Sequence, residues 1–600
     1  MASTHSGSPI PRGPESGCEA TVIGDEKVAR TESAASRLAG EDARLSRGAE
    51  TGLFFFALAL RLPTLALRHM VEGDGVHYAQ LARAILAGDF SGLANPYWSN
   101  LWPAAIAATS WLVGLDVVAA GRVLSLLAGG LLAVVAARLA ARCFGPTTGL
   151  VAGLLVADHP WLIHFSTLVF TESFFTLLLV ALLLVAIPAV RATVPALGAG
   201  LLAGLAMVTR PEAYSTSALV LVWVVVRGWS QSRRSAVLRG LLFSGIVALC
   251  MVGRACAVHH YFDLWDFGVG VKGTANLFVG LADTDREKER LRTEVTASGD
   301  TRLDQAASET TIVGFSRAHP NAMARHVARN LVCLLGCTAR VFPQIAPIGD
   351  WSALREDLSR PMWIAALTLA LATCGLALLG IIAGLRDRGS RSVSSLLALT
   401  GGLYLLGLAP LNVHERLVVS LVPLFLIFVA HGLVRVAQRF RWARGRYVRG
   451  ALVTLLSSCG VLALGVLLRA PTLDYAADQL VQRDAGRWLA THRSQDERIM
   501  TAAPAVGFYF YDAHHQENER SLPWADIAGV IGLARSQGVS LIVAPEWHLR
   551  AVDHPAASTL LDPTTQFPGL LHVASLGDEA RGRILVWQVR AIPEERTARP

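Results

Sequence analysis

Long uncharged apolar runs constrain this chain more than any other feature of its sequence. The clearest lie at 362–385, 393–410, 417–434 and 451–468. Each is long enough to cross the hydrocarbon core of a bilayer as a helix. A lone strand in lipid would leave its backbone N–H and C=O groups unpaired, whereas a helix pairs them internally. Since 52% of the 600 residues are hydrophobic and only 17% are charged, we predict an all-α polytopic membrane protein.

The same pattern predicts about 11 transmembrane helices. They are expected near 52–67, 117–141, 147–165, 173–190, 195–209, 213–228, 239–258, 361–385, 393–410, 417–435 and 450–468. If residues 1–50 lie inside, the inward loops are rich in arginine, whereas the short outward loops hold only Arg210 and Arg416. This positive-inside pattern places the N-terminus in the cytoplasm. It also accounts for the net charge of +8 without nucleic acid as a partner.

The segments outside the membrane differ in composition. Residues 1–50 have no aromatic side chain and many Ser, Ala and Gly, which predicts a disordered cytoplasmic tail. The transmembrane domain then covers 51–469, with outward loops at 68–116 and 259–360. Residues 470–600 are expected to form a small extracytoplasmic α/β domain, with helices near 475–489 and 524–537 and strands near 540–544, 570–575 and 583–589.

The segment 71–78, Val-Glu-Gly-Asp-Gly-Val-His-Tyr, carries the strongest chemical signal. It places Glu72 and Asp74 just beyond the first span, before an amphipathic stretch. Carboxylates there can reach both lipid-borne and external substrates. An acid at a membrane edge can also be merely solvated, but flanking glycines and neighbouring helices favour a functional role for Asp74.

From this segment onward the chain resembles the GT-C glycosyltransferases that use polyprenyl-phosphate sugars, a superfamily that includes protein O-mannosyltransferases and the lipid A aminoarabinose transferase. In those enzymes an outward acidic motif after the first helix holds an essential Asp, and Asp74-Gly-Val-His-Tyr-Ala is similar to it. The other matching pieces are Gly121-Arg122-Val-Leu-Ser, Arg142-Cys-Phe-Gly-Pro, Thr171-Glu172, Thr209-Arg210-Pro-Glu-Ala and His414-Glu-Arg416. The resemblance covers roughly the membrane portion and implies the GT-C fold.

The residue types that the resemblance implies are also those that the chemistry of sugar transfer requires. Transfer from a lipid phosphate needs a base for the acceptor hydroxyl and cations for the departing phosphate. Asp74 is the expected base, and Glu172 would share that role or orient the acceptor, unless it only complements its helix dipole. The expected substrate-binding residues are Glu72, His77, Tyr78, Arg210, Lys272 and Arg416. Arg210, Arg416 and Lys272 would hold the phosphate, although a membrane-edge arginine can also simply snorkel to the interface.

Two features limit the assignment of ligands, the first for the donor phosphate and the second for a metal ion. The family often carries a Lys-Pro pair late in the first outward loop, where this chain has Asn95-Pro96. Asp512, His514, His515 and Glu517 contain metal-ligand types, but consecutive histidines in a polar loop are usually solvated. We therefore predict no cofactor and assign no metal, since no ligand set supports a divalent ion.

The resemblance implies an inverting glycosyltransferase, which we expect at the outer face of a bacterial inner (plasma) membrane. It would move a sugar from a polyprenyl-phosphate donor to a lipid, glycan or protein acceptor, and the sequence names neither the sugar nor the acceptor. The alternative is a transporter or flippase of a lipid-linked or anionic substrate, in which acids and arginines would form a pathway at mid-membrane depth. A third reading is a degenerate family member that acts as a scaffold.

Overall fold

The computed structural model describes residues 45–71, 73–268, 317, 320–342, 360–411, 415–439, 472–578 and 582–590. Several predictions lie outside these residues. Among them are the tail before residue 45, most of the outward loop predicted at 259–360, the span at 450–468, and the candidate residues Glu72, Lys272 and His414.

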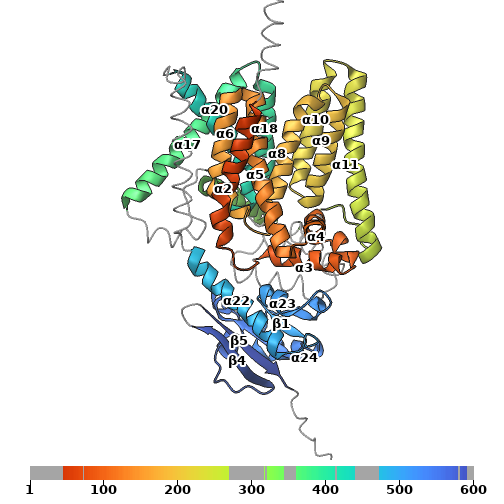
Figure 1. Ribbon diagram of the computed structural model, residues 1–600, viewed down its shortest axis with the longest axis vertical. Coiled ribbons are helices and arrows are strands. Elements are labelled where there is room, and N and C mark those ends of the chain that lie inside the picture. The colour runs from red at the N-terminus through yellow and green to blue at the C-terminus, as the bar shows by residue number, and fades with distance from the viewer. Residues whose placement is uncertain are drawn as a thin grey trace, which may run out of the picture.

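A bundle of helices, most of them apolar, makes up the larger part of the described chain (Figure 1). Its helices are α2 (Arg47–Ala66), α5 (Val117–Phe144), α6 (Pro146–Asp158), α7 (Pro160–Phe165), α8 (Glu172–Ala189), α9 (Thr193–Thr209), α10 (Ala213–Trp229), α11 (Arg233–Phe262), α15 (Pro320–Val341), α17 (Arg360–Arg386), α18 (Arg391–Leu408), α19 (Glu415–Val418), η2 (Val419–Leu421) and α20 (Val422–Arg439).

Six helical segments of the described chain are long and apolar enough to cross a membrane: α2, α5, α8, α11, α18 and the run from α19 through α20. Shorter apolar helices, among them α6, α9 and α10, pack between them. The protein is therefore a mostly helical integral membrane protein. Helices lie at each of the predicted positions from 52–67 to 417–435, and the total of 11 spans stays a prediction.

The predicted span 147–165 is broken into α6 and α7. Pro160 has no N–H to donate, and it holds the preceding His159 in an extended conformation with φ −65° and ψ 121°. Arg61 of α2 compensates the break, because its Nη1 donates to the carbonyl oxygens of Ala157 (2.9 Å) and Ala57 (2.7 Å). Its fully buried side chain thus serves the fold.

Short helices cross the lower end of the bundle (Figure 1). They are α3 (Asp74–Leu86), η1 (Phe90–Ala94) and α4 (Leu101–Val113). Tyr78 and Trp102, buried side chains of α3 and α4, pack with Val169 of the loop before α8 and with Phe508 of the C-terminal domain. This apolar cluster joins the bundle to the domain beneath it.

Residues 472–590 fold around a five-stranded sheet in the order β2-β1-β3-β5-β4. The strands β2, β1 and β3 are parallel, whereas β5 and β4 pair antiparallel. The elements are α22 (Thr472–His492), β1 (Ile499–Thr501), α23 (Pro504–Phe510), η4 (Gln516–Asn518), β2 (Glu519–Ser521), α24 (Ile527–Ser536), β3 (Leu541–Pro545), α25 (Glu546–Ala551), α26 (Ala557–Leu560), β4 (Leu570–Asp578) and β5 (Gly582–Val589). The three predicted strands correspond to β3, β4 and β5, while β1 and β2 were not predicted.

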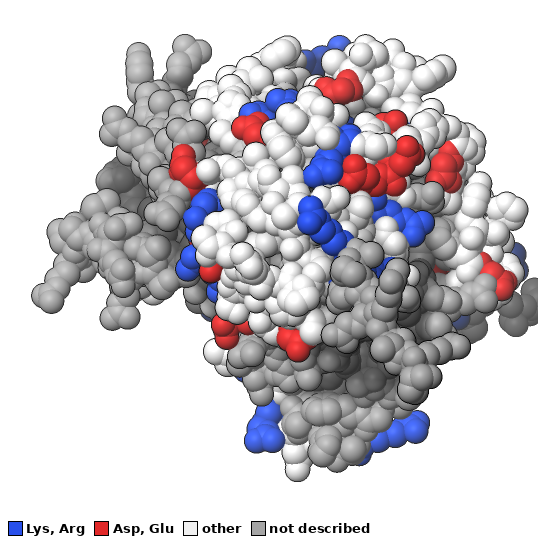
Figure 2. Space-filling model, turned by 90° about the horizontal axis from the view of Figure 1, so that it is seen from below, with Lys and Arg blue, Asp and Glu red and all other residues white. Residues whose placement is uncertain are grey.

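The face of the molecule seen from below carries charged side chains of both signs (Figure 2). Among the described residues on that face, Lys and Arg are interspersed with Asp and Glu and do not gather into a patch of one sign. Such a mixed surface is typical of a water-facing domain.

Candidate active site

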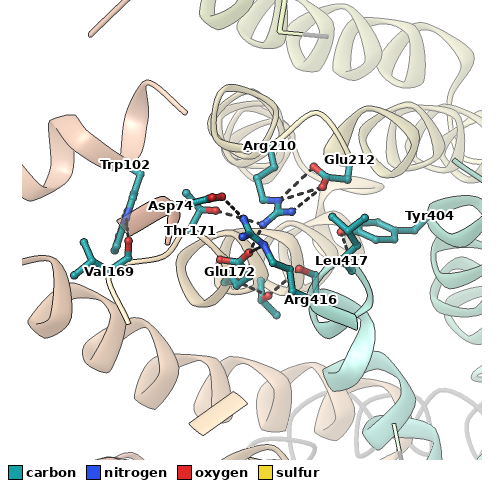
Figure 3. Close-up of polar contacts among 12 residues, drawn as sticks. Asp74, Trp102, Val169, Thr171, Glu172, Arg210, Glu212, Tyr404, Arg416 and Leu417 are labelled. Carbon is teal, nitrogen blue, oxygen red and sulfur yellow. Dashed lines mark hydrogen bonds and ion pairs between the residues drawn. The ribbon is translucent and has the colours of Figure 1, made fainter. Parts of the chain in front are cut away.

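Five charged side chains meet at the lower end of the bundle (Figure 3). Asp74 is the first residue of α3 and Glu172 the first residue of α8. Arg210 follows α9, Glu212 precedes α10, and Arg416 lies in α19. The predicted residues Asp74, Glu172, Arg210 and Arg416 are therefore brought together from four separate segments.

Glu172 is the centre of this cluster. Its Oε1 lies 2.8 Å from Nη1 of Arg210 and 2.8 Å from Nε of Arg416. The Glu172 side chain has no exposed surface. A buried carboxylate between two guanidinium groups is strongly favoured over an unpaired one, so Glu172 fixes the positions of both arginines.

Arg210 owes its position to the residue that follows it. Pro211 disfavours a helical conformation at Arg210, which is extended with φ −151° and ψ 136° and ends α9. The side chain then turns back toward Glu172 and also pairs with Glu212, whose Oε1 lies 2.9 Å from Nη2. Thr171 Oγ1 accepts a further hydrogen bond from Nη1 at 3.4 Å.

Asp74 is the acid of the cluster that a substrate can reach. Its Oδ2 lies 2.5 Å from Nη2 of Arg416, and the two side chains are 25% and 23% exposed. A group that takes a proton from an acceptor must touch that acceptor, which the fully buried Glu172 is badly placed to do. The geometry thus favours Asp74 as the reacting acid and Glu172 as the residue that positions its partner.

The glycines that flank Asp74 accommodate the close approach of the loop before α8. Gly73 has φ +49°, and a Cβ there would lie 3.2 Å from Cζ of Phe170. A Cβ on Gly75 would lie 3.2 Å from the carbonyl oxygen of Val169. Phe170 in turn faces Arg416, whose Cζ is 5.2 Å from the ring centroid. The Gly-Asp-Gly sequence therefore lets Asp74 sit directly against the loop that leads to Glu172.

Arg122 supports the loop between α2 and α3, from which Asp74 projects. Its Nη1 donates to the carbonyl oxygen of Arg68 at 3.0 Å, and its Nη2 donates to that of Met70 at 2.5 Å. The adjacent Gly121 makes room for the loop before α8, because a Cβ there would lie 2.6 Å from Cγ1 of Val169. The Gly121-Arg122 motif is thus structural, and it holds the segment that carries Asp74.

Two other predicted substrate-binding residues form a wall beside the cluster. The ring of His77 stacks on Trp98 with centroids 4.6 Å apart, and Tyr78 meets the same indole edge-on at 5.5 Å. Tyr78 is only 3% exposed, and burial together with the nearby charge of Asp74 raises its pKa. Tyr78 therefore contributes packing, whereas the partly exposed His77 is better placed to contact a substrate.

Sequence reasoning missed two polar members of the site. Glu212 lies within the quoted Thr-Arg-Pro-Glu-Ala motif, and the Arg-Pro-Glu spacing was the signal that could have found it. Tyr404 of α18 donates from its hydroxyl to the carbonyl oxygen of Leu417 at 3.2 Å, which fastens the short helix that carries Arg416. No local sequence pattern marks that contact, since it joins different helices.

The two arginines are already neutralised by carboxylates. Asp74, Glu172 and Glu212 together face Arg210 and Arg416, so three acids oppose two cations. Arg416 is 23% exposed at its side chain and Arg210 is 10% exposed. Of the two predicted phosphate ligands that lie among the described residues, Arg416 is therefore the one that a donor would reach more readily.

The histidines at 514 and 515 are engaged in ordinary polar contacts. His515 Nδ1 lies 2.8 Å from Oδ1 of Asp512, and this hydrogen bond raises the pKa of the imidazole. Within the described part of the chain no group of three or more His, Cys, Asp or Glu side chains is arranged to hold a metal ion. A metal site therefore stays unassigned.

Glu519 lies where the C-terminal domain meets α3. Gln80 Nε2 donates to its Oε2 at 3.5 Å, and a Cβ on Gly507 of α23 would lie 2.1 Å from the same oxygen. Burial raises the pKa of Glu519 to about 8, against an ordinary value of 4.5. The folded interface thus favours the protonated carboxyl.

This shift predicts that the contact weakens as pH rises. Between pH 4.5 and about 8 the unfolded chain releases the Glu519 proton while the folded chain keeps it, so unfolding is increasingly favoured. The stabilisation is complete below pH 4.5 and is lost as pH rises through about 8. We expect the Tm of the purified protein to fall by about 5 °C more between pH 5 and pH 8.5 than that of Glu519→Gln. Identical pH profiles of Tm for the two proteins would contradict this assignment.

Comparison with known structures identifies the fold. The structure matches the oligosaccharyltransferase of Archaeoglobus fulgidus, solved with Zn and sulfate, with a TM-score of 0.53 and 12% identity, covering 88% of this chain and 72% of that one. Its apo form gives a TM-score of 0.52 at 13% identity, over 85% and 71% of the two chains. The chain therefore shares the fold of this oligosaccharyltransferase, in agreement with the GT-C fold that the sequence resemblance implied.

The remaining comparisons do not strengthen the assignment of the fold. ArnT from Cupriavidus metallidurans, bound to undecaprenyl phosphate, matches at 14% identity over 90% of this chain and 98% of that one, with a TM-score of only 0.38. No protein-family model matches the sequence, and no curated protein sequence matches it either. The assignment of the fold thus rests on the oligosaccharyltransferase.

Proposed function

We propose that the protein is a glycosyltransferase that moves a sugar from a polyprenyl-phosphate donor to a lipid, glycan or protein acceptor. The observation that carries this proposal is the Asp74–Arg416 pair, partly exposed and anchored on the buried Glu172, at one end of a bundle with the GT-C fold. A lipid-linked donor approaches such a site from the bilayer, while a water-borne acceptor approaches from the side of the C-terminal domain.

In the proposed reaction Asp74 accepts the proton of the acceptor hydroxyl while that oxygen attacks the anomeric carbon of the sugar. The bond between this carbon and the phosphate oxygen breaks, and the lipid phosphate leaves with the electron pair. Arg416, which touches Asp74, is placed to stabilise the negative charge on the departing phosphate. Because the attack is a single displacement, the anomeric configuration inverts.

The reaction is proposed at the outer face of a bacterial plasma membrane, with the N-terminus in the cytoplasm. Arginines such as Arg142, Arg227 and Arg386 lie in the last turns of helices that end opposite the cluster, as the positive-inside rule expects. The acceptor class stays open. The Archaeoglobus fulgidus oligosaccharyltransferase has been solved with a tethered acceptor peptide containing the NVT sequon, so a protein acceptor belongs among the candidates to test.

The position of the charged cluster supports transfer over transport. Asp74 and Glu172 begin their helices and Arg210 ends α9, whereas a transport pathway would require charges at mid-membrane depth. The test reconstitutes the purified protein in liposomes with a panel of polyprenyl-phosphate sugars and candidate acceptors. We expect free polyprenyl phosphate and glycosylated acceptor in equal amounts. Movement of a lipid-linked substrate across the bilayer without released lipid phosphate would replace the transferase with a flippase.

A further inference from the structure

We propose that Tyr509, in the C-terminal domain, is a positioning residue for Asp74, and that α22 and α23 clamp the loop from which Asp74 projects. The proposal rests on the proposed function where it concerns turnover. Tyr509 does not belong to the charged cluster and lies 438 residues further along the chain than the amide it binds.

The clamp acts on the backbone of the loop between α2 and α3. The amide of Val71 donates to the hydroxyl oxygen of Tyr509 at 3.1 Å. Arg483 of α22 donates from Nη1 to the carbonyl oxygen of His69 at 3.3 Å. Arg122 of the bundle donates to the carbonyl oxygens of the neighbouring Arg68 and Met70. The bundle and the C-terminal domain therefore both bind the backbone of the same short segment.

The helix that begins with Asp74 rests on the same domain. Arg83 of α3 donates from Nη1 to the carbonyl oxygen of Phe508 at 3.0 Å, and its Cζ lies 3.7 Å from the centroid of that ring. Phe508 and Ala505 of α23 are buried in the apolar cluster that contains Tyr78 of α3. A shift of α23 would therefore move α3 with it.

The start of α3 depends on this outside support. Its N-cap residue is Gly73, which offers no side-chain hydrogen bond to the first turn and adopts a positive φ. The usual local anchor of a helix N-terminus is thus missing where Asp74 must meet Arg416. A displacement of about 1 Å in an active site can lower the rate on the order of 100-fold. Loss of the Tyr509 hydroxyl is therefore expected to lower the turnover rate, because it would let Asp74 move.

The test compares Tyr509→Phe with Tyr511→Phe in the full-length protein. Phenylalanine at 509 keeps the ring and removes only the hydroxyl that the Val71 amide binds. Tyr511 lies two residues away, and its hydroxyl donates to the carbonyl oxygen of Glu497 at 2.6 Å and accepts from the Ile499 amide at 3.0 Å, both within the C-terminal domain. It is therefore a matched control that alters the domain without touching the loop.

Two readouts are combined: hydrogen–deuterium exchange of the 68–73 segment, which needs no substrate, and kcat and KM for lipid-phosphate release. We expect Tyr509→Phe to speed exchange in this segment and to lower kcat about tenfold with KM changed less than about twofold, while Tyr511→Phe does neither. Unchanged exchange in Tyr509→Phe would overturn the clamp. Faster exchange with wild-type kcat would overturn the positioning role. If the wild-type protein releases no lipid phosphate from any donor, the proposed function fails, and exchange alone decides whether the clamp exists.

Discussion

Asp74→Asn is expected to lower kcat for sugar transfer by about 10³-fold, the usual loss when a general base is removed. Asparagine keeps the size of the side chain and an oxygen that can accept from Arg416, but it cannot take the acceptor proton. The KM for the donor should stay within about threefold, because Asp74 acts on the acceptor. Release of lipid phosphate from a saturating donor, measured over time, gives both constants.

Asp89→Asn is the matched control for this substitution. Asp89 lies in the same outward loop, is exposed, and accepts a hydrogen bond from the Ser91 amide that asparagine can also accept. We expect Asp89→Asn to retain wild-type turnover. Equal turnover in Asp74→Asn and Asp89→Asn would remove Asp74 from the role of base.

Glu172→Gln is expected to destabilise the protein by about 3 kcal/mol, because it removes the buried charge that two guanidinium groups share. Arg210 would keep Glu212 and Arg416 would keep Asp74, but the two cations would face each other with one less carboxylate between them. Activity should fall as well, since Glu172 positions Arg416. Denaturant unfolding in lipid–detergent micelles measures the change.

Glu50→Gln supplies the comparison. Glu50 of α2 pairs with Arg138 at 2.6 Å, where the arginine side chain is 51% exposed. An exposed ion pair of this kind contributes about 0–1 kcal/mol, so this variant should unfold close to wild type. If Glu172→Gln and Glu50→Gln lost equal stability, the buried carboxylate of Glu172 would have no special role in the fold.

The helical bundle was predictable because lipid imposes a simple rule on sequence. Runs such as 393–410 must be apolar and must pair their backbone internally, so hydropathy alone located α18. The break at Pro160 was missed, since its compensation by Arg61 depends on a helix about 100 residues away. In the C-terminal domain, β1 and β2 have three residues each, too few for a periodic pattern.

Four of the five charged residues that meet in the candidate site were predicted from the sequence, whereas Glu212 and the geometry of the cluster were not. The resemblance pointed to Asp74, Glu172, Arg210 and Arg416, which the fold brings together. Only the structure separates the two acids, because exposure distinguishes the reachable Asp74 from the buried Glu172. Contacts across the fold, such as that from Tyr509 to Val71, leave no local signal in the sequence. Glu72 and Lys272 lie outside the described residues and stay predictions.

We propose that a lipid-linked sugar reacts at the Asp74–Arg416 pair. A polyprenyl-phosphate sugar with a photoreactive group on the sugar tests it most directly, by cross-linking in liposomes and mapping of the labelled peptides. We predict labels in the peptides that contain Asp74, Thr171 and Arg416, which unlabelled donor suppresses. Labels confined to the ends of α5 and α9 that lie away from the charged cluster would contradict the proposal. So would labels that unlabelled donor does not suppress.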